Sequence, residues 1–109
     1  MKRGDVVTVA VGGDYGKPRP AVIIQTDALP DSHASTIICQ MTSVIEASRH
    51  LRVLVEPSAI NGLRLRSHVM ADKPMAVHRK RVGRTIGRLT DQEMAQLESA
   101  LAFVMGLVD

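Results

Sequence analysis

Hydrophobic and polar residues alternate in several short stretches of this chain, which is the pattern of half-buried β-strands. The clearest runs from Leu51 to Glu56, where Leu51, Val53 and Val55 would share one face. Another strand is expected around residues 67 to 71, after a strong turn signal at Asn61-Gly62. Three further stretches predict strands: Val6 to Val11, Ala21 to about Thr26, and Thr36 to Met41.

The C-terminal region has the period of an amphipathic helix. Thr90 and Glu93 match a capping box at its start. Apolar residues then recur every three or four positions in one stripe, namely Met94, Leu97, Leu101, Val104, Met105 and Val108. Phe103 is also expected in the helix core. Several short strands without helical crossovers, covered by one terminal helix, predict an antiparallel barrel or strongly curved sheet.

The chain length of 109 residues suits a single domain, 1–109. The start carries no apolar signal region, and the longest nearly apolar run, Ala100 to Val108, is far shorter than the roughly 20 residues that cross a bilayer. We therefore expect a cytoplasmic protein. The one cysteine, Cys39, lies in an apolar run and is expected to be a buried, inert thiol.

Charge is unevenly distributed along the chain. Residues 61–88 hold eight basic residues and one acidic residue, whereas residues 89–109 hold four acidic residues and no basic one. A basic segment of this kind suits a polyanionic partner, but it is also typical of a solvated face. The charge pattern alone leaves both interpretations open.

The stretch from Lys17 to Asp27 contains the strongest candidate for a functional side chain. Arg19 stands between Pro18 and Pro20, which fix the backbone, and it leads directly into an apolar strand. Such an arginine is either a rigidly held functional guanidinium or a solvated turn residue. Thr42 and Ser43 likewise end a predicted strand, either as site hydroxyls or as a cap on a helical turn over Val44 to Ser48.

Other kinds of site are poorly supported by the sequence. The four histidines are scattered, and there is no HExxH, Walker, dinucleotide-glycine or GxSxG motif. Tyr15 and Phe103 are the only aromatic residues, which argues against a base-stacking platform. The remaining chemistry is directed at phosphate: the planar fork of Arg19, the hydroxyl of Thr42 and the basic segment together suit phosphodiester cleavage without a metal.

Six segments, in order, resemble the MazF/PemK/Kid toxins of bacterial toxin–antitoxin systems. They are Gly4-Asp5-Val6, RPAVIIQTD at 19–27, TIICQMTS at 36–43, LRVLVEP at 51–57, GLRLRSHVMAD at 62–72 and a closing stretch that begins IGRLTDQEM. The resemblance covers nearly the whole chain. It implies an SH3-like curved antiparallel barrel with a C-terminal α-helix, a homodimer, and an endoribonuclease that needs no metal or cofactor and arrests growth.

The resemblance also implies a reaction and its residues. The 2′-hydroxyl of single-stranded RNA would attack the adjacent phosphate and leave a 2′,3′-cyclic phosphate and a 5′-hydroxyl. Arg19 matches the family's catalytic arginine, which would stabilise the phosphorane charge, and Thr42 matches its catalytic threonine. Some members carry an Arg-x-Asp pair; here Asp72 matches the aspartate, but Met70 stands in the arginine's place.

The expected partners are RNA, whether mRNA, tRNA or rRNA, and a cognate antitoxin with an acidic or amphipathic segment, encoded next to the toxin. The expected substrate-binding residues are Tyr15, Lys17, Ser43, Asp72, Arg79 and Lys80. Two alternatives stay open at this point. One is a toxin of the same fold that binds a protein such as DNA gyrase, and the other is a non-catalytic RNA-binding SH3-like domain.

Overall fold

The computed structural model describes residues 1–10, 17–45 and 51–108. Within these ranges the chain forms six strands, one 3₁₀ turn and one α-helix. In chain order they are β1 Asp5–Val9, β2 Arg19–Ile23, β3 Ser35–Thr42, β4 Arg52–Val55, β5 Ser67–His78, η1 Arg79–Arg81, β6 Val82–Arg88 and α1 Asp91–Val104.

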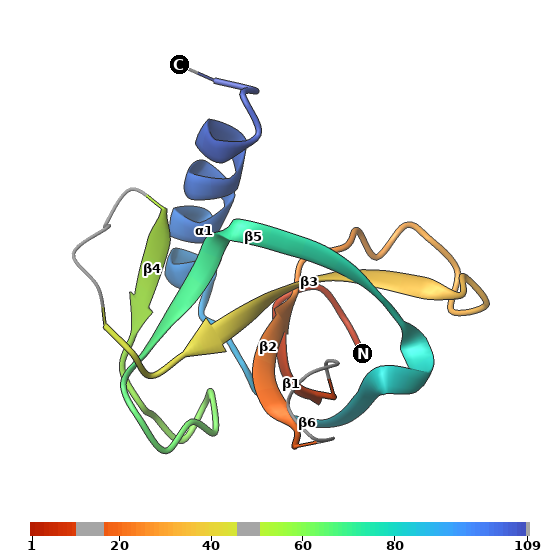
Figure 1. The fold of residues 1–109 in the computed structure, drawn as a ribbon, viewed down its shortest axis with the longest axis horizontal. Coiled ribbons are helices and arrows are strands. Elements are labelled where there is room, and N and C mark those ends of the chain that lie inside the picture. Colours follow the sequence, from red (N-terminus) through yellow and green to blue (C-terminus); the bar gives the residue numbers. More distant parts are fainter. Residues whose placement is uncertain (11–16, 46–50, 109) are drawn as a thin grey trace.

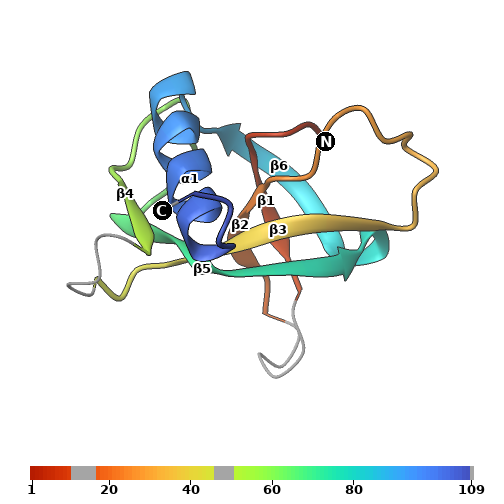
Figure 2. The ribbon, with the colours of Figure 1, turned by 90° about the horizontal axis from the view of Figure 1, so that it is seen from above.

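The strands form one sheet in the order β4-β5-β3-β2-β1-β6, and every neighbouring pair is antiparallel. The sheet curls strongly without closing, and α1 lies beside β4 and β5 at one end of it (Figures 1 and 2). The prediction of a curved antiparallel sheet with one C-terminal helix is therefore confirmed.

Three expectations about the elements differ from the structure. The strand expected at 67–71 continues to His78, and β6 was not predicted as a strand at all. β6 is mostly exposed and contains two shifts of register against β1, so it lacks a regular alternation. Val44 and Ile45 are not helical, and the rest of the proposed helical turn lies outside the described residues, as does Val11.

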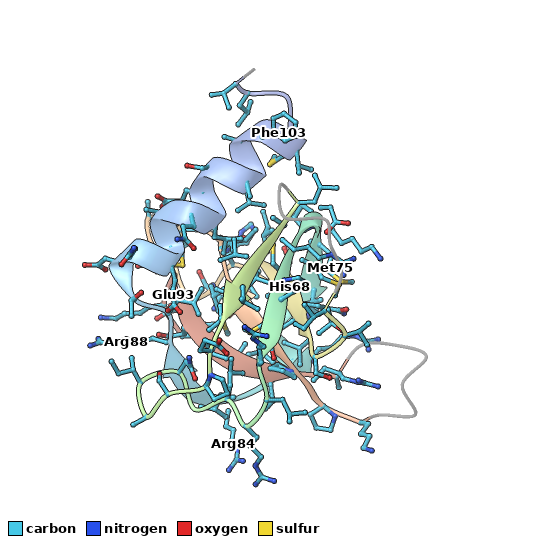
Figure 3. All side chains as sticks on the ribbon, turned by 90° about the vertical axis from the view of Figure 1, so that its left-hand side faces the viewer. His68, Met75, Arg84, Arg88, Glu93 and Phe103 are labelled. Carbon is cyan, nitrogen blue, oxygen red and sulfur yellow. The ribbon has the colours of Figure 1, made fainter. Side chains whose placement is uncertain are left out.

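The capping box that starts α1 is confirmed. The hydroxyl oxygen of Thr90 accepts from the Glu93 N–H at 3.1 Å, and the Thr90 N–H donates to Glu93 Oε1 at 2.8 Å. Leu97 and Leu101 are buried against the sheet. The placement of Phe103 in the core was wrong, because its side chain is 51% exposed where the last turn of α1 extends past the sheet (Figures 1 and 3).

The two faces of the sheet bury separate apolar clusters, because neighbouring residues of a strand point to opposite faces. Val6 packs in the cluster under α1, whereas Val7 packs in the cluster on the other face. Cys39 is buried in the first cluster, and burial, assisted by the charge of Asp72, raises the pKa of its thiol to about 12. The thiol is therefore protonated at neutral pH, as expected for an inert cysteine.

No helix among the described residues is long and apolar enough to span a membrane.

Candidate functional site

A groove of about 390 Å³ opens where the start of β2, the end of β3, the loop before β5 and the bulged part of β6 meet. Its lining contains three arginines and four threonine or serine residues, and the rest is glycine, proline and apolar residues. The lining residues are Thr8, Pro18, Arg19, Pro20, Met41, Thr42, Ser43, Gly62, Leu63, Arg64, Leu65, Ser67, Arg84 and Ile86.

The antiparallel pairing of β2 and β3 brings Arg19 and Thr42 to the same end of the sheet. Ala21 pairs with Gln40, so Arg19 and Thr42, each two residues beyond this pair, lie at the same end of the two strands. Arg19 is the first residue of β2 and is exposed, while Thr42 is the last residue of β3 and is half-buried. The two residues that the sequence singled out as catalytic therefore line one groove.

The hydroxyl oxygen of Thr42 accepts a hydrogen bond from the backbone N–H of Val44 at 3.1 Å. This bond to the residue two positions ahead forms an ST turn; Val44 and Ile45 are not helical, and the rest of the helical turn that Thr42 or Ser43 was expected to cap lies outside the described residues. Because the oxygen already accepts, its O–H is directed elsewhere and can donate to a ligand in the groove.

Asn61 fixes the loop that forms one wall of the groove. Its side chain is almost fully buried, its Oδ1 accepts from the N–H groups of Ser58 and Leu63 at 3.0 Å each, and its Nδ2 donates to the Glu56 carbonyl at 2.8 Å. The Asn61-Gly62 signal was interpreted only as a turn. In the fold, this amide holds Leu63 and Arg64 at the groove.

The groove has a strongly positive lining. Arg19, Arg64 and Arg84 line it, and none of its described lining residues is acidic. Three guanidiniums at one groove favour an anionic ligand. Sequence reasoning missed Arg64 and Arg84. Both belong to the basic stretch 61–88, but that stretch does not show which of its arginines reach the groove: Arg64 lines it, whereas Arg66 pairs with Glu56.

The remaining predicted substrate-binding residues lie at different distances from the groove. Ser43 lines it, and Lys17 is exposed immediately before Pro18, which also lines it. Tyr15 lies outside the described residues. Asp72 is not at the groove: its Oδ1 lies 3.5 Å from Arg52 Nε, in an ion pair that joins β4 and β5.

Asp72 has an arginine partner although Met70 stands where the family resemblance led us to expect one. Arg52 stands directly opposite Met70 in the pairing of β4 with β5. A guanidinium therefore still accompanies the carboxylate, but it comes from the neighbouring strand. Both side chains are largely buried, so the pair joins the two strands.

Arg79 and Lys80 belong to η1 and do not line the groove. His78, which precedes η1, pairs with Ser35 at the start of β3, whereas Thr42 ends that strand, roughly 20 Å away along it. The Arg79 guanidinium donates to the His33 carbonyl oxygen, and the Lys80 N–H donates to His78 Nδ1. The structure does not bring these two basic residues together with Arg19.

The described residues contain no group of three or more His, Cys, Asp or Glu side chains arranged to hold a metal ion. His68 is buried and pairs with Thr42 across β3 and β5, but it does not line the groove (Figure 3). The polar side chains that line the groove are guanidinium and hydroxyl groups.

Known proteins resemble this chain in sequence and in fold. The chain is 37% identical over 108 residues to a probable endoribonuclease MazF of Mycolicibacterium smegmatis, covering 98% of each chain. It is 27% identical to the endoribonuclease EndoA of Bacillus subtilis, covering 100% of this chain and 97% of the relative. The fold matches a mycobacterial endoribonuclease solved in complex with its cognate antitoxin, with a TM-score of 0.83, 23% identity and coverage of 100% of this chain and 98% of that one.

The comparisons give no support to the gyrase-binding or non-catalytic alternatives. The family model for the PemK-like, MazF-like toxin of type II toxin–antitoxin systems matches residues 2–105. This match spans nearly the whole chain and agrees with the resemblance drawn from the sequence. The chain therefore belongs to the PemK-like, MazF-like family of type II toxins.

Proposed function

We propose that this protein is the toxin of a type II toxin–antitoxin system and that its groove cleaves single-stranded RNA without a metal ion. The observation that carries the proposal is the placing of Arg19 and Thr42 in one groove whose described lining has three arginines and no carboxylate. Two relatives named as endoribonucleases support it.

In the proposed reaction the 2′-oxygen bonds to the adjacent phosphorus while the bond from phosphorus to the 5′-oxygen breaks. The 2′-hydroxyl loses its proton, the departing 5′-oxygen gains one, and the products are a 2′,3′-cyclic phosphate and a 5′-hydroxyl. The phosphorane carries extra negative charge. Arg19 stabilises that charge with its fork of N–H donors, a role that suits a side chain that stays protonated in proteins.

Thr42 would orient the scissile phosphate or the 2′-hydroxyl. Its oxygen is held by the Val44 N–H, so its O–H is the group left to donate. Lys17 and Ser43, near Arg19 and Thr42, are proposed backbone contacts for the RNA. Substrate contacts by Tyr15, Asp72, Arg79 and Lys80 stay predictions from the sequence (Tyr15 lies outside the described residues).

Two further partners belong to the proposal. An antitoxin segment with acidic or amphipathic character would cover the arginine-lined groove, and a solved relative is in complex with its cognate antitoxin. A second copy of the chain would complete a homodimer. With cellular RNA as the proposed substrate, the proposed site of action is the cytoplasm.

The proposal is tested by incubating the purified protein with RNAs of varied sequence in the presence of EDTA. We expect cleavage to continue and to yield 5′-hydroxyl and 2′,3′-cyclic phosphate ends, which sequencing of 5′-hydroxyl ends and phosphatase resistance identify. Complete protection of every RNA by EDTA would contradict metal independence. Intact RNA both with and without EDTA would contradict the ribonuclease assignment.

Removal of the Thr42 hydroxyl should slow cleavage without unfolding the protein. Thr42→Val keeps the side-chain shape and is expected to lower kcat about 10- to 100-fold, because a hydrogen bond to a charged group contributes about 1.5–3 kcal/mol. Thr42→Ser should recover most of the rate. Thr85→Val makes the same change at an exposed strand residue outside the groove and serves as the control. Equal rates for Thr42→Val and Thr85→Val would rule out a role for the hydroxyl.

A further inference from the structure

The strand β6 contains a bulge at the groove. Val7 of β1 pairs with Thr85, and Val9 pairs with Val82. Two residues of β6, Gly83 and Arg84, therefore stand opposite the single residue Thr8. A bulge of this kind changes the direction of a side chain relative to a regular strand, and bulges often lie beside active sites.

A hydrogen bond and a close approach, both at Thr8, define the bulge. The Thr8 hydroxyl oxygen accepts from the Arg84 backbone N–H at 3.1 Å. A Cβ atom added at Gly83 would lie 2.4 Å from the same oxygen, so the close approach requires glycine. The bulge is thus a defined local structure in which a side-chain acceptor satisfies the N–H of Arg84.

This arrangement leaves Arg84 exposed at the groove. Thr8 and Arg84 both line the groove. Figure 3 shows Arg84 projecting from the end of the molecule far from α1, whereas Arg88 of the same strand points to a different side, near the start of α1. Arg88 lines a separate hollow together with Thr90 and Asp91.

We propose that the bulge at Gly83 and Arg84, held by Thr8, positions Arg84 to bind a backbone phosphate of the RNA next to the scissile one. This inference rests on the proposed ribonuclease function. Arg84 is exposed and lines the groove, and no described lining residue is acidic, so its guanidinium has the environment of a phosphate contact. Arg19 acts on the scissile phosphate, and Arg84 holds the strand in register beside it.

The direct test compares Arg84→Gln with Arg88→Gln in steady-state RNA cleavage at several salt concentrations. The two variants lose the same charge from the same strand, but only Arg84 lines the groove. For Arg84→Gln we expect KM to rise about 5- to 20-fold with a smaller change in kcat. The slope of log KM against log salt should fall by about 0.7, the value for one phosphate contact on a single strand. Arg84→Lys should recover most of KM, and Arg88→Gln should keep the wild-type KM.

The positioning by Thr8 is tested separately. Thr8→Val removes the acceptor at nearly constant volume and is expected to raise KM about 2- to 5-fold with the same direction of change in salt slope, whereas Thr8→Ser recovers most of the loss. A structural effect alone would lower the unfolding midpoint without changing the salt slope. That outcome would overturn the positioning role.

The outcomes separate this inference from the function on which it rests. If the wild-type protein leaves every RNA intact, the ribonuclease function is wrong. If the wild type cleaves while Arg84→Gln keeps the KM and salt slope of Arg88→Gln, the function stands and the phosphate contact is wrong. If Arg84→Lys fails to recover KM and the preferred cleavage sequence changes, Arg84 contacts a base, which also overturns the phosphate assignment.

Discussion

Arg19→Ala is expected to lower kcat for RNA cleavage by about 10²- to 10³-fold, because loss of one donor to a developing oxyanion typically has this effect. Arg19 is exposed at the first position of β2, so its removal should change the free energy of unfolding by less than about 0.5 kcal/mol. The rate is measured with a short fluorescent RNA, and the stability by urea denaturation.

Arg66→Ala is the matched control. Arg66 is also exposed, pairs with Glu56 at 3.2 Å and does not line the groove. Arg19→Lys keeps a positive charge but loses the planar fork, so it should recover only part of the rate. A wild-type kcat for Arg19→Ala, or an equal loss for Arg66→Ala, would show that cleavage does not depend on the guanidinium of Arg19.

The elements that the sequence predicted well are those with a strong local pattern. Val53 and Val55 alternate with an exposed Leu54, as expected for β4. At the start of α1, the side chains of Thr90 and Glu93 each accept a hydrogen bond from the other residue's backbone N–H. In both cases the signal lies within a few consecutive residues. Local pattern and tertiary packing agree there.

β6 could not be predicted in this way, because its pairing depends on the tertiary fold. Its two register shifts break the alternation, and its glycines fit places where another part of the chain comes very close. A Cβ at Gly83 would clash with Thr8, and one at Gly87 would lie 2.4 Å from the Ile60 carbonyl oxygen. Glycines of this kind look like turn residues in the sequence, although here they permit close packing of a strand.

The catalytic pair and the charged surroundings of the site were predictable to different degrees. Arg19 and Thr42 end their strands, and antiparallel pairing is enough to bring strand ends together. The consecutive basic residues Arg79 and Lys80 had the highest local charge, yet the structure places Arg64 and Arg84 at the groove instead. A charge count along the chain cannot show which basic side chains share a face.

Gly62→Ala is expected to destabilise the protein by about 2–6 kcal/mol. Gly62 has φ +69°, and a Cβ there would lie 2.1 Å from the Ile86 carbonyl oxygen and 2.9 Å from its carbon. A left-handed backbone conformation costs about 1–3 kcal/mol for a residue other than glycine, and overpacking costs about 1–3 kcal/mol more. A loss of this size is a large part of the stability of a small domain. Urea denaturation measures it.

Gly106→Ala separates the two contributions. Gly106 has φ +74°, but a Cβ there would have no neighbour within 4 Å, so the substitution should cost only the backbone strain. Because Gly62 and Ile86 both line the groove, the clash would also push two of its walls apart. At a temperature where both variants remain folded, Gly62→Ala should therefore lose cleavage activity while Gly106→Ala keeps it. Equal stability and equal activity of the two variants would mean that the loop moves freely away from β6, and that the groove does not depend on this close approach.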